Sequence, residues 1–93
     1  ISVITFDSES EAIELANSTR YGLAAGIWTG ISGQGQRVAR AITSGSVWIN
    51  TYGIFHPTLP FGGTKSSGFG RELGESAIEG YTEIKTIVED ISE

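Results

Sequence analysis

The sequence predicts an α/β fold in which strands and helices alternate as β-α-β-α-β over a mostly parallel sheet. Short β-branched or apolar runs at 1–6, 23–28 and 46–50 are separated by two segments with helical periodicity. A long glycine-rich loop, a short helix and a β-prone C-terminal segment follow them. The 93 residues make one small domain at most, because a chain of this length buries only a modest core.

The first strand and the first helix are expected on either side of a capping signal. Residues 1–6 have β-branched or aromatic side chains at nearly every second position, which is typical of a strand. Ser8 and Glu11 form a Ser-x-x-Glu capping box, so a helix should begin there. Its apolar positions recur at helical spacing, at Ala12, Leu15, Ala16 and Thr19. Gly22 fits a helix-ending position.

The second and third strands are expected at 23–28 and 46–50. Both runs are short and apolar, which suits buried strands, and we expect Trp28 and Trp48 to lie in the core. A helix is predicted between them over 32–43.

Glycines weaken the start of this second helix. Gly33 and Gly35 each cost about 1 kcal/mol relative to alanine inside a helix, so the regular part is expected only from about Gln36. Gly45 can end the helix.

Regular structure is expected again only near the C-terminus. A short helix is predicted at 72–79, with Gly80 at its exit, and residues 82–91 form a β-prone segment with apolar side chains on both faces. A terminal strand of this kind should dock on another domain or subunit, because its free edge is unpaired. The alternative is an ordinary edge strand of this domain.

Composition excludes several classes of function. The net charge of −5 and the absence of a Lys/Arg cluster argue against a nucleic-acid partner. The absence of cysteine excludes disulfides, thiolate zinc sites and a cysteine nucleophile within this chain. The chain has no methionine and begins in mid-pattern, so we expect a piece of a longer protein. No signal peptide or membrane-spanning run is recognisable, which favours a soluble, cytoplasmic parent without a membrane partner.

The loop that follows the third strand is where a function should lie, because ligands bind beyond the carboxyl ends of parallel strands. Its glycine-rich part, "PFGGTKSSGFGRELG" at 60–74, does not match either of two nucleotide-binding motifs. Lys65 follows a threonine and not a glycine, and Leu73 stands where a dinucleotide fingerprint needs its third glycine. A flexible tether would not need Phe61 and Phe69, so we expect an ordered, closely packed loop.

This stretch resembles the carboxyl-terminal part of the NAD(P)-dependent aldehyde dehydrogenase superfamily. The resemblance includes "SGSVWINTYGIF" before it, "YTEIKTI" after it and "EAIELANSTRYGLAAGIWT" upstream, and therefore covers almost the whole chain. It implies that residues 1–81 are the end of a catalytic domain and that 82–93 are the oligomerisation strand. The implied partners are the remainder of the enzyme and further copies of it, in a homo-oligomer that is a dimer or a tetramer.

The resemblance also implies a reaction. In that family a cysteine forms a thiohemiacetal with the aldehyde, hydride passes to the nicotinamide of NAD or NADP, and the thioester is hydrolysed to the acid. The nucleophile, the glutamate that activates water and the dinucleotide domain all come from upstream sequence. We therefore expect this chain alone to be inactive and to bind no cofactor. The alternative is a stand-alone, non-catalytic α/β module with a binding or assembly role.

Several residues match positions that shape the substrate tunnel. By resemblance, Phe55 and Phe61 are apolar walls beside the aldehyde; the alternative is core packing under the loop. Thr51 and Gly53 occupy loop positions that tune substrate preference within the family. His56 is a lone histidine, for which a surface or packing role is expected.

A second group of residues lies after the glycines. Glu72 resembles a buried carboxylate that relays protons toward the catalytic glutamate; the alternative is a helix-capping role. Arg71 and Glu83 are expected to form an ionic element that holds the loop, the short helix and the last strand together, within the chain or across a subunit interface; the alternative is two unrelated surface charges.

Three further residues, Asn50, Lys65 and Gly68, are expected to act through backbone groups. Asn50 is expected to order the loop through side-chain hydrogen bonds to the backbone. Lys65 and Gly68 match positions whose carbonyls bind a monovalent cation between subunits in some members of the family.

Overall fold

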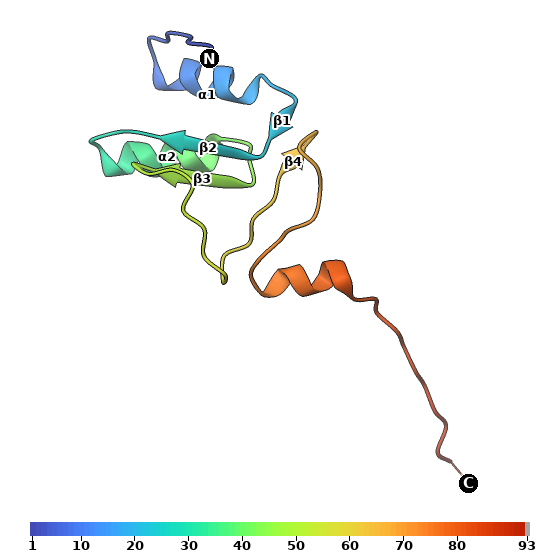
Figure 1. The fold of residues 1–93 in the computed structure, drawn as a ribbon. Helices are drawn as coiled ribbons and strands as arrows, with labels where there is room; N and C mark the ends of the chain where they lie inside the picture. Colours follow the sequence, from blue (N-terminus) through green and yellow to red (C-terminus); the bar gives the residue numbers. More distant parts are fainter. Residues whose placement is uncertain (93) are drawn as a thin grey trace.

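Within residues 1–92 the chain forms two short two-stranded sheets, two α-helices and one 3₁₀ helix (Figure 1). The computed structural model describes residues 1–92. In chain order the elements are α1 (Glu9–Asn17), β1 (Tyr21–Gly22), β2 (Ala24–Ile27), α2 (Ser32–Ala41), β3 (Ser46–Ile49), β4 (Thr64–Lys65) and the 3₁₀ helix η1 (Glu75–Tyr81). None of these helices is long and apolar enough to cross a membrane.

The start of α1 follows the predicted capping box. The Glu11 backbone N–H donates to Ser8 Oγ at 3.2 Å, and the Asp7 N–H donates to Glu11 Oε2 at 2.9 Å. The helix ends at Asn17, earlier than predicted, and Gly22 is not its cap. Gly22 instead lies buried in β1, where a Cβ would come within 2.5 Å of Thr64 Oγ1.

The parallel pairing predicted for the central strands is confirmed. β2 and β3 pair in parallel, with Gly26 opposite Trp48 and Ile27 opposite Ile49. Trp48 is half-buried, whereas Trp28 lies beyond the end of β2 and is 67% exposed, so the prediction that it is a core residue is wrong.

Helix α2 crosses this sheet and begins at Ser32, four residues before the predicted start of regular helix. Gly35 is buried, and a Cβ there would lie 3.0 Å from Cγ2 of Ile49. The contact between α2 and β3 therefore compensates for the low helix propensity of glycine. The helix ends at Ala41, before Gly45.

The second sheet differs from the prediction. β1 and β4 pair antiparallel, with Tyr21 opposite Lys65 and Gly22 opposite Thr64, so only one of the two sheets is parallel. Residues 1–6 form no strand, although they have the composition of one. Nothing in the described chain pairs with them, and Ile1, Val3, Ile4 and Phe6 are exposed. A strand sequence needs a ladder partner as well as the right side chains.

The C-terminal segment projects away from the rest of the molecule (Figure 1). Residues 82–92 form no strand within this chain, and the molecule measures 75 × 25 × 24 Å as a result. The short helix that precedes them is a 3₁₀ helix that begins at Glu75, three residues later than predicted, and it includes Gly80.

Candidate functional site

A mostly apolar pocket lies between the first three residues of β3 and the loop at 51–61, which follows that strand. Its volume is about 230 Å³, and its lining has no carboxylate, lysine or arginine. The lining residues are Ser46, Val47, Trp48, Ile54, Phe55, His56, Leu59, Pro60 and Phe61. Such a surface suits an apolar group.

Aromatic rings form one wall of the pocket. The rings of Phe55 and Phe61 meet edge to face, with their centroids 5.0 Å apart and their planes at 83°. Phe55 also meets Trp48 edge to face, at 5.8 Å, and Trp48 lies 4.9 Å from Tyr52. Edge-to-face contacts of this length are favourable and fix the orientation of each ring.

The other residues predicted at the pocket are placed differently. Thr51 and Gly53 are exposed and do not line the pocket, and Gly53 has a φ of +74°. His56 lines the pocket, but its Nδ1 atom is 2.8 Å from Oγ1 of Thr58, so that nitrogen is engaged in a local contact.

Glycines bring the end of the loop against the start of β3. A Cβ at Gly45 would overlap the Gly62 carbonyl, and a Cβ at Gly63 would come within 2.6 Å of Cβ of Ser67. The prediction of a closely packed, ordered loop is confirmed at these positions. Gly68 and Gly70 have open space around them, but their φ values of +116° and +85° require glycine.

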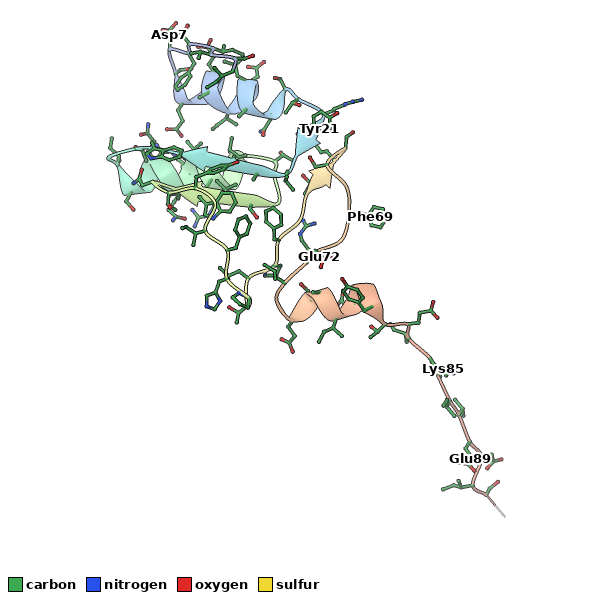
Figure 2. All side chains as sticks on the ribbon, viewed as in Figure 1. Asp7, Tyr21, Phe69, Glu72, Lys85 and Glu89 are labelled. Carbon is green, nitrogen blue, oxygen red and sulfur yellow. The ribbon has the colours of Figure 1, made fainter. Side chains whose placement is uncertain are left out.

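Glu72 is held next to the aromatic wall by its backbone. Phe61 and Glu72 form an antiparallel bridge, with N–H···O distances of 2.7 Å in both directions. The Glu72 side chain, labelled in Figure 2, is exposed in this chain. The Tyr81 hydroxyl lies 3.4 Å from its Oε2 atom. The helix-capping alternative is wrong, because η1 begins only at Glu75. No feature of the sequence pointed to Tyr81.

Arg71 binds the loop and not Glu83. Its Nη1 atom donates to the carbonyls of Gly63 and Gly70, both at 2.8 Å, and thereby ties the two glycine segments together. Glu83 lies on the exposed C-terminal segment. Within the described residues of one chain Arg71 and Glu83 form no ion pair, and a pair between subunits stays a prediction.

Arg37 and Glu9 form an ion pair that the sequence analysis missed. It joins α2 to α1 through an Nη2–Oε2 contact of 2.8 Å and an Nε–Oε1 contact of 2.9 Å. The hydrogen bond from Arg37 lowers the pKa of the Glu9 carboxyl, and Glu9 in turn raises the pKa of Arg37. Their separation of 28 residues leaves no local sequence signal for the pair.

Asn50 lies at the point where the chain leaves the sheet. Its φ is +58°, its N–H donates to the Ile27 carbonyl at 2.7 Å, and its Oδ1 accepts from the Thr29 N–H at 2.9 Å. Asparagine tolerates this left-handed conformation better than most residues. Thr29 also donates from Oγ1 to Gln34 at 2.7 Å, so these polar groups join β3, the turn after β2 and α2.

Lys65 ends β4, and Gly68 lies in the turn that follows it. The Gly68 N–H donates to the Lys65 carbonyl at 3.3 Å, and Lys65 Nζ donates to the Thr19 carbonyl at 3.0 Å. Residues 1–92 contain no group of three or more His, Cys, Asp and Glu side chains placed to hold a metal.

The glycines of this segment do not fit a dinucleotide. In dinucleotide sites such glycines lead directly into a helix whose N-terminus faces the pyrophosphate. Here Gly68 and Gly70 are followed by the bridge at Glu72, and η1 begins only at Glu75 and is a 3₁₀ helix.

The sequence of this chain is similar to those of known dehydrogenases. The profile described as "Aldehyde dehydrogenase family" matches residues 1–87. The 2-aminomuconic semialdehyde dehydrogenase of Bos taurus is 52% identical over 85 residues, which are 91% of this chain and 18% of that protein. Betaine aldehyde dehydrogenase 1 of Rhizobium meliloti is 47% identical over the same shares of the two chains.

Solved structures of such enzymes are similar to this chain in fold as well. The NAD⁺ complex of an aldehyde dehydrogenase from Bacillus cereus superposes with a TM-score of 0.86 at 49% identity, over 94% of this chain and 18% of that one. The apo structure of an indole-3-acetaldehyde dehydrogenase gives a TM-score of 0.86 at 50% identity, over 90% of this chain and 20% of that one. The chain thus spans about a fifth of the length of these relatives. From the family match over residues 1–87 and these identities, the chain belongs to the aldehyde dehydrogenase family.

Proposed function

We propose that this chain is the carboxyl-terminal part of an NAD(P)-dependent aldehyde dehydrogenase and forms one wall of its substrate tunnel. The observation that carries the proposal is the pocket beside β3, in which Phe55 and Phe61 meet edge to face. The named activities of the relatives, which include semialdehyde and betaine aldehyde dehydrogenases, support an aldehyde as the substrate.

The pocket contributes by binding and orientation. Its aromatic wall excludes water from the aldehyde, and a bound aldehyde chain would be held in a narrow range of orientations toward the nucleophile. The chain has no cysteine, so the nucleophile must come from the rest of the enzyme. The glycine segment does not fit a dinucleotide, so we assign the NAD or NADP site to that remainder as well. The cofactor, when bound there, accepts hydride from the substrate.

The C-terminal segment is proposed to be the oligomerisation strand, so that residues 1–81 and 82–93 have different roles. Four apolar side chains on it are 83–100% exposed, and they are Ile84, Ile87, Val88 and Ile91. Apolar side chains and unpaired backbone of this kind are stable only when another chain or domain covers them. The partner we propose is a second copy of the enzyme.

An activity assay tests the proposal. The complete enzyme should reduce NAD or NADP in the presence of an aldehyde, and the 93-residue chain alone should not. The absorbance of the reduced nicotinamide measures the activity of the complete enzyme and of the isolated chain. A complete protein that binds partners but oxidises no aldehyde in a broad panel would favour a non-catalytic assembly module.

A further inference from the structure

Trp48 occupies an unusual position between the sheet and the pocket. Its backbone belongs to β3 and pairs with β2, while its side chain lines the pocket. Its indole N–H donates to the Ile54 carbonyl at 3.0 Å, which is a good length for a neutral hydrogen bond. A rigid strand residue therefore contacts the backbone of the loop directly.

The loop has little else to hold it. Residues 51–55 make no backbone-to-backbone hydrogen bond within the described chain, and all five are exposed. The Ile54 carbonyl is instead satisfied by the Trp48 indole. A segment with so few bonds opens easily unless side chains anchor it.

Ring packing extends this anchor to the pocket wall. Gly26 lies opposite Trp48 in the sheet, and a Cβ there would come within 2.7 Å of the Trp28 ring and 2.8 Å of the Tyr52 ring, so the glycine leaves room for both rings, and Tyr52 packs beside Trp48. Phe55 contacts both Trp48 and Phe61, each time with the two ring planes nearly perpendicular. The orientation of the Phe55–Phe61 pair thus depends on a ring that the sheet holds in place.

We infer that Trp48 is a positioning residue for aldehyde binding, which acts by fixing Ile54 and Phe55 through its indole N–H and its ring. The inference rests on the proposed function of the pocket. Without the N–H, the backbone at Ile54 loses its bond to the sheet, and Phe55 no longer has one preferred orientation against Phe61. Substrate affinity then falls, while the nucleophile and the cofactor site are unaffected.

Two changes at Trp48 separate the hydrogen bond from the ring. Trp48→Phe removes the donor and part of the ring. Replacement of Trp48 by the benzothienyl analogue of tryptophan, in which sulfur takes the place of N–H, removes the donor and keeps the shape. Trp28→Phe is the matched control, because Trp28 is 67% exposed and lies outside this pocket. All three are made in the complete enzyme, with Phe61→Ala alongside.

The expected result is a rise of about fivefold in the KM for aldehyde in both Trp48 variants, since one neutral hydrogen bond is lost. The kcat, the KM for the cofactor and the melting temperature of the benzothienyl variant should stay near the values of the unmodified enzyme. Trp28→Phe should leave all of them unchanged.

Other outcomes overturn the inference in distinguishable ways. An unchanged KM in the benzothienyl variant, with a raised KM in Phe61→Ala, would leave the pocket assignment standing and remove the role of Trp48. If the KM is unchanged in the benzothienyl variant and also in Phe61→Ala, the proposed function of the pocket is contradicted as well. If Trp48→Phe does not fold, the benzothienyl variant alone decides, because it preserves the packing.

Discussion

Phe61 and Glu72 exchange two backbone hydrogen bonds of 2.7 Å each, so an aromatic wall of the pocket and the carboxylate proposed as a proton relay lie in one antiparallel bridge. Arg71, the residue before Glu72, ties the same segment to the Gly63 carbonyl. A change that shifts one side of this bridge must therefore shift the other. If Phe61 contacts the aldehyde and Glu72 relays protons, as proposed, this bridge joins the two roles through the backbone.

Phe61→Ala should lower kcat/KM for aldehyde by an amount equivalent to about 1–2 kcal/mol, because the substrate loses apolar contact area. Steady-state kinetics of the complete enzyme measure it. Phe69→Ala is the control, since it removes the same ring from an exposed position that points away from the pocket (Figure 2). Unchanged kinetics together with lowered stability would mean that Phe61 is only a packing residue.

Glu72→Gln should slow hydrolysis of the thioester more than hydride transfer. The amide keeps the size of the side chain and the backbone bridge but cannot accept a proton as a carboxylate does. Rapid-mixing kinetics should show a normal burst of reduced cofactor followed by a slower steady state. Glu75→Gln, at the start of η1, provides a matched control. An undiminished steady-state rate in Glu72→Gln would exclude the relay.

Gly45→Ala should destabilise the protein by about 1–3 kcal/mol, because the added methyl group overlaps the Gly62 carbonyl and must displace the loop. Gly33→Ala should have the opposite effect on stability. A Cβ at Gly33 meets nothing within 4 Å, so the substitution in α2 should stabilise the helix by about 0.4–1 kcal/mol. Urea unfolding of the complete enzyme measures both changes. Equal effects of the two substitutions would contradict the close approach at Gly45.

Truncation before Thr82 should disrupt the oligomer, because it removes the exposed apolar side chains of the C-terminal segment. Light scattering should report a smaller particle. Val88→Lys is a milder test, since it places a charge on the same segment and leaves the length of the chain unchanged. An oligomer of normal size after truncation would show that these residues are not the interface.

The Glu9–Arg37 ion pair should make stability depend on pH in the acidic range. The pKa of Glu9 is lowered from 4.5 by its hydrogen bond with Arg37. The folded state therefore stabilises the charged carboxylate more than the unfolded chain does. Its stabilising contribution is present above pH 4.5 and is lost as the pH falls through the lowered value. Both side chains are partly exposed, so the effect is small and screened by salt.

Thermal melts between pH 7 and pH 3, with and without Glu9→Gln, measure this contribution. The two melting curves should converge as the pH falls. Glu14→Gln on the same helix is the matched control. A difference between the unmodified protein and Glu9→Gln that stays constant with pH would contradict the assignment.

Local signals in the sequence determined much of the fold and part of the site. The Ser8–Glu11 capping box predicted the start of α1, since the two side chains satisfy backbone groups only a few residues away. The apolar runs predicted the β2–β3 pair. The motif at 60–74 identified the family and led to Phe61, because it depends on residue identities at fixed spacing.

The tertiary structure alone decided which segments find partners. Residues 1–6 and 82–91 have the composition of strands but form none, because a ladder needs a second strand and this chain supplies none to them. The Phe61–Glu72 bridge, the overlap between Gly45 and Gly62 and the bond from Trp48 to Ile54 join residues by close approach in space. Sequence periodicity describes which face a side chain occupies, but it contains no information on which other segment will lie against that face.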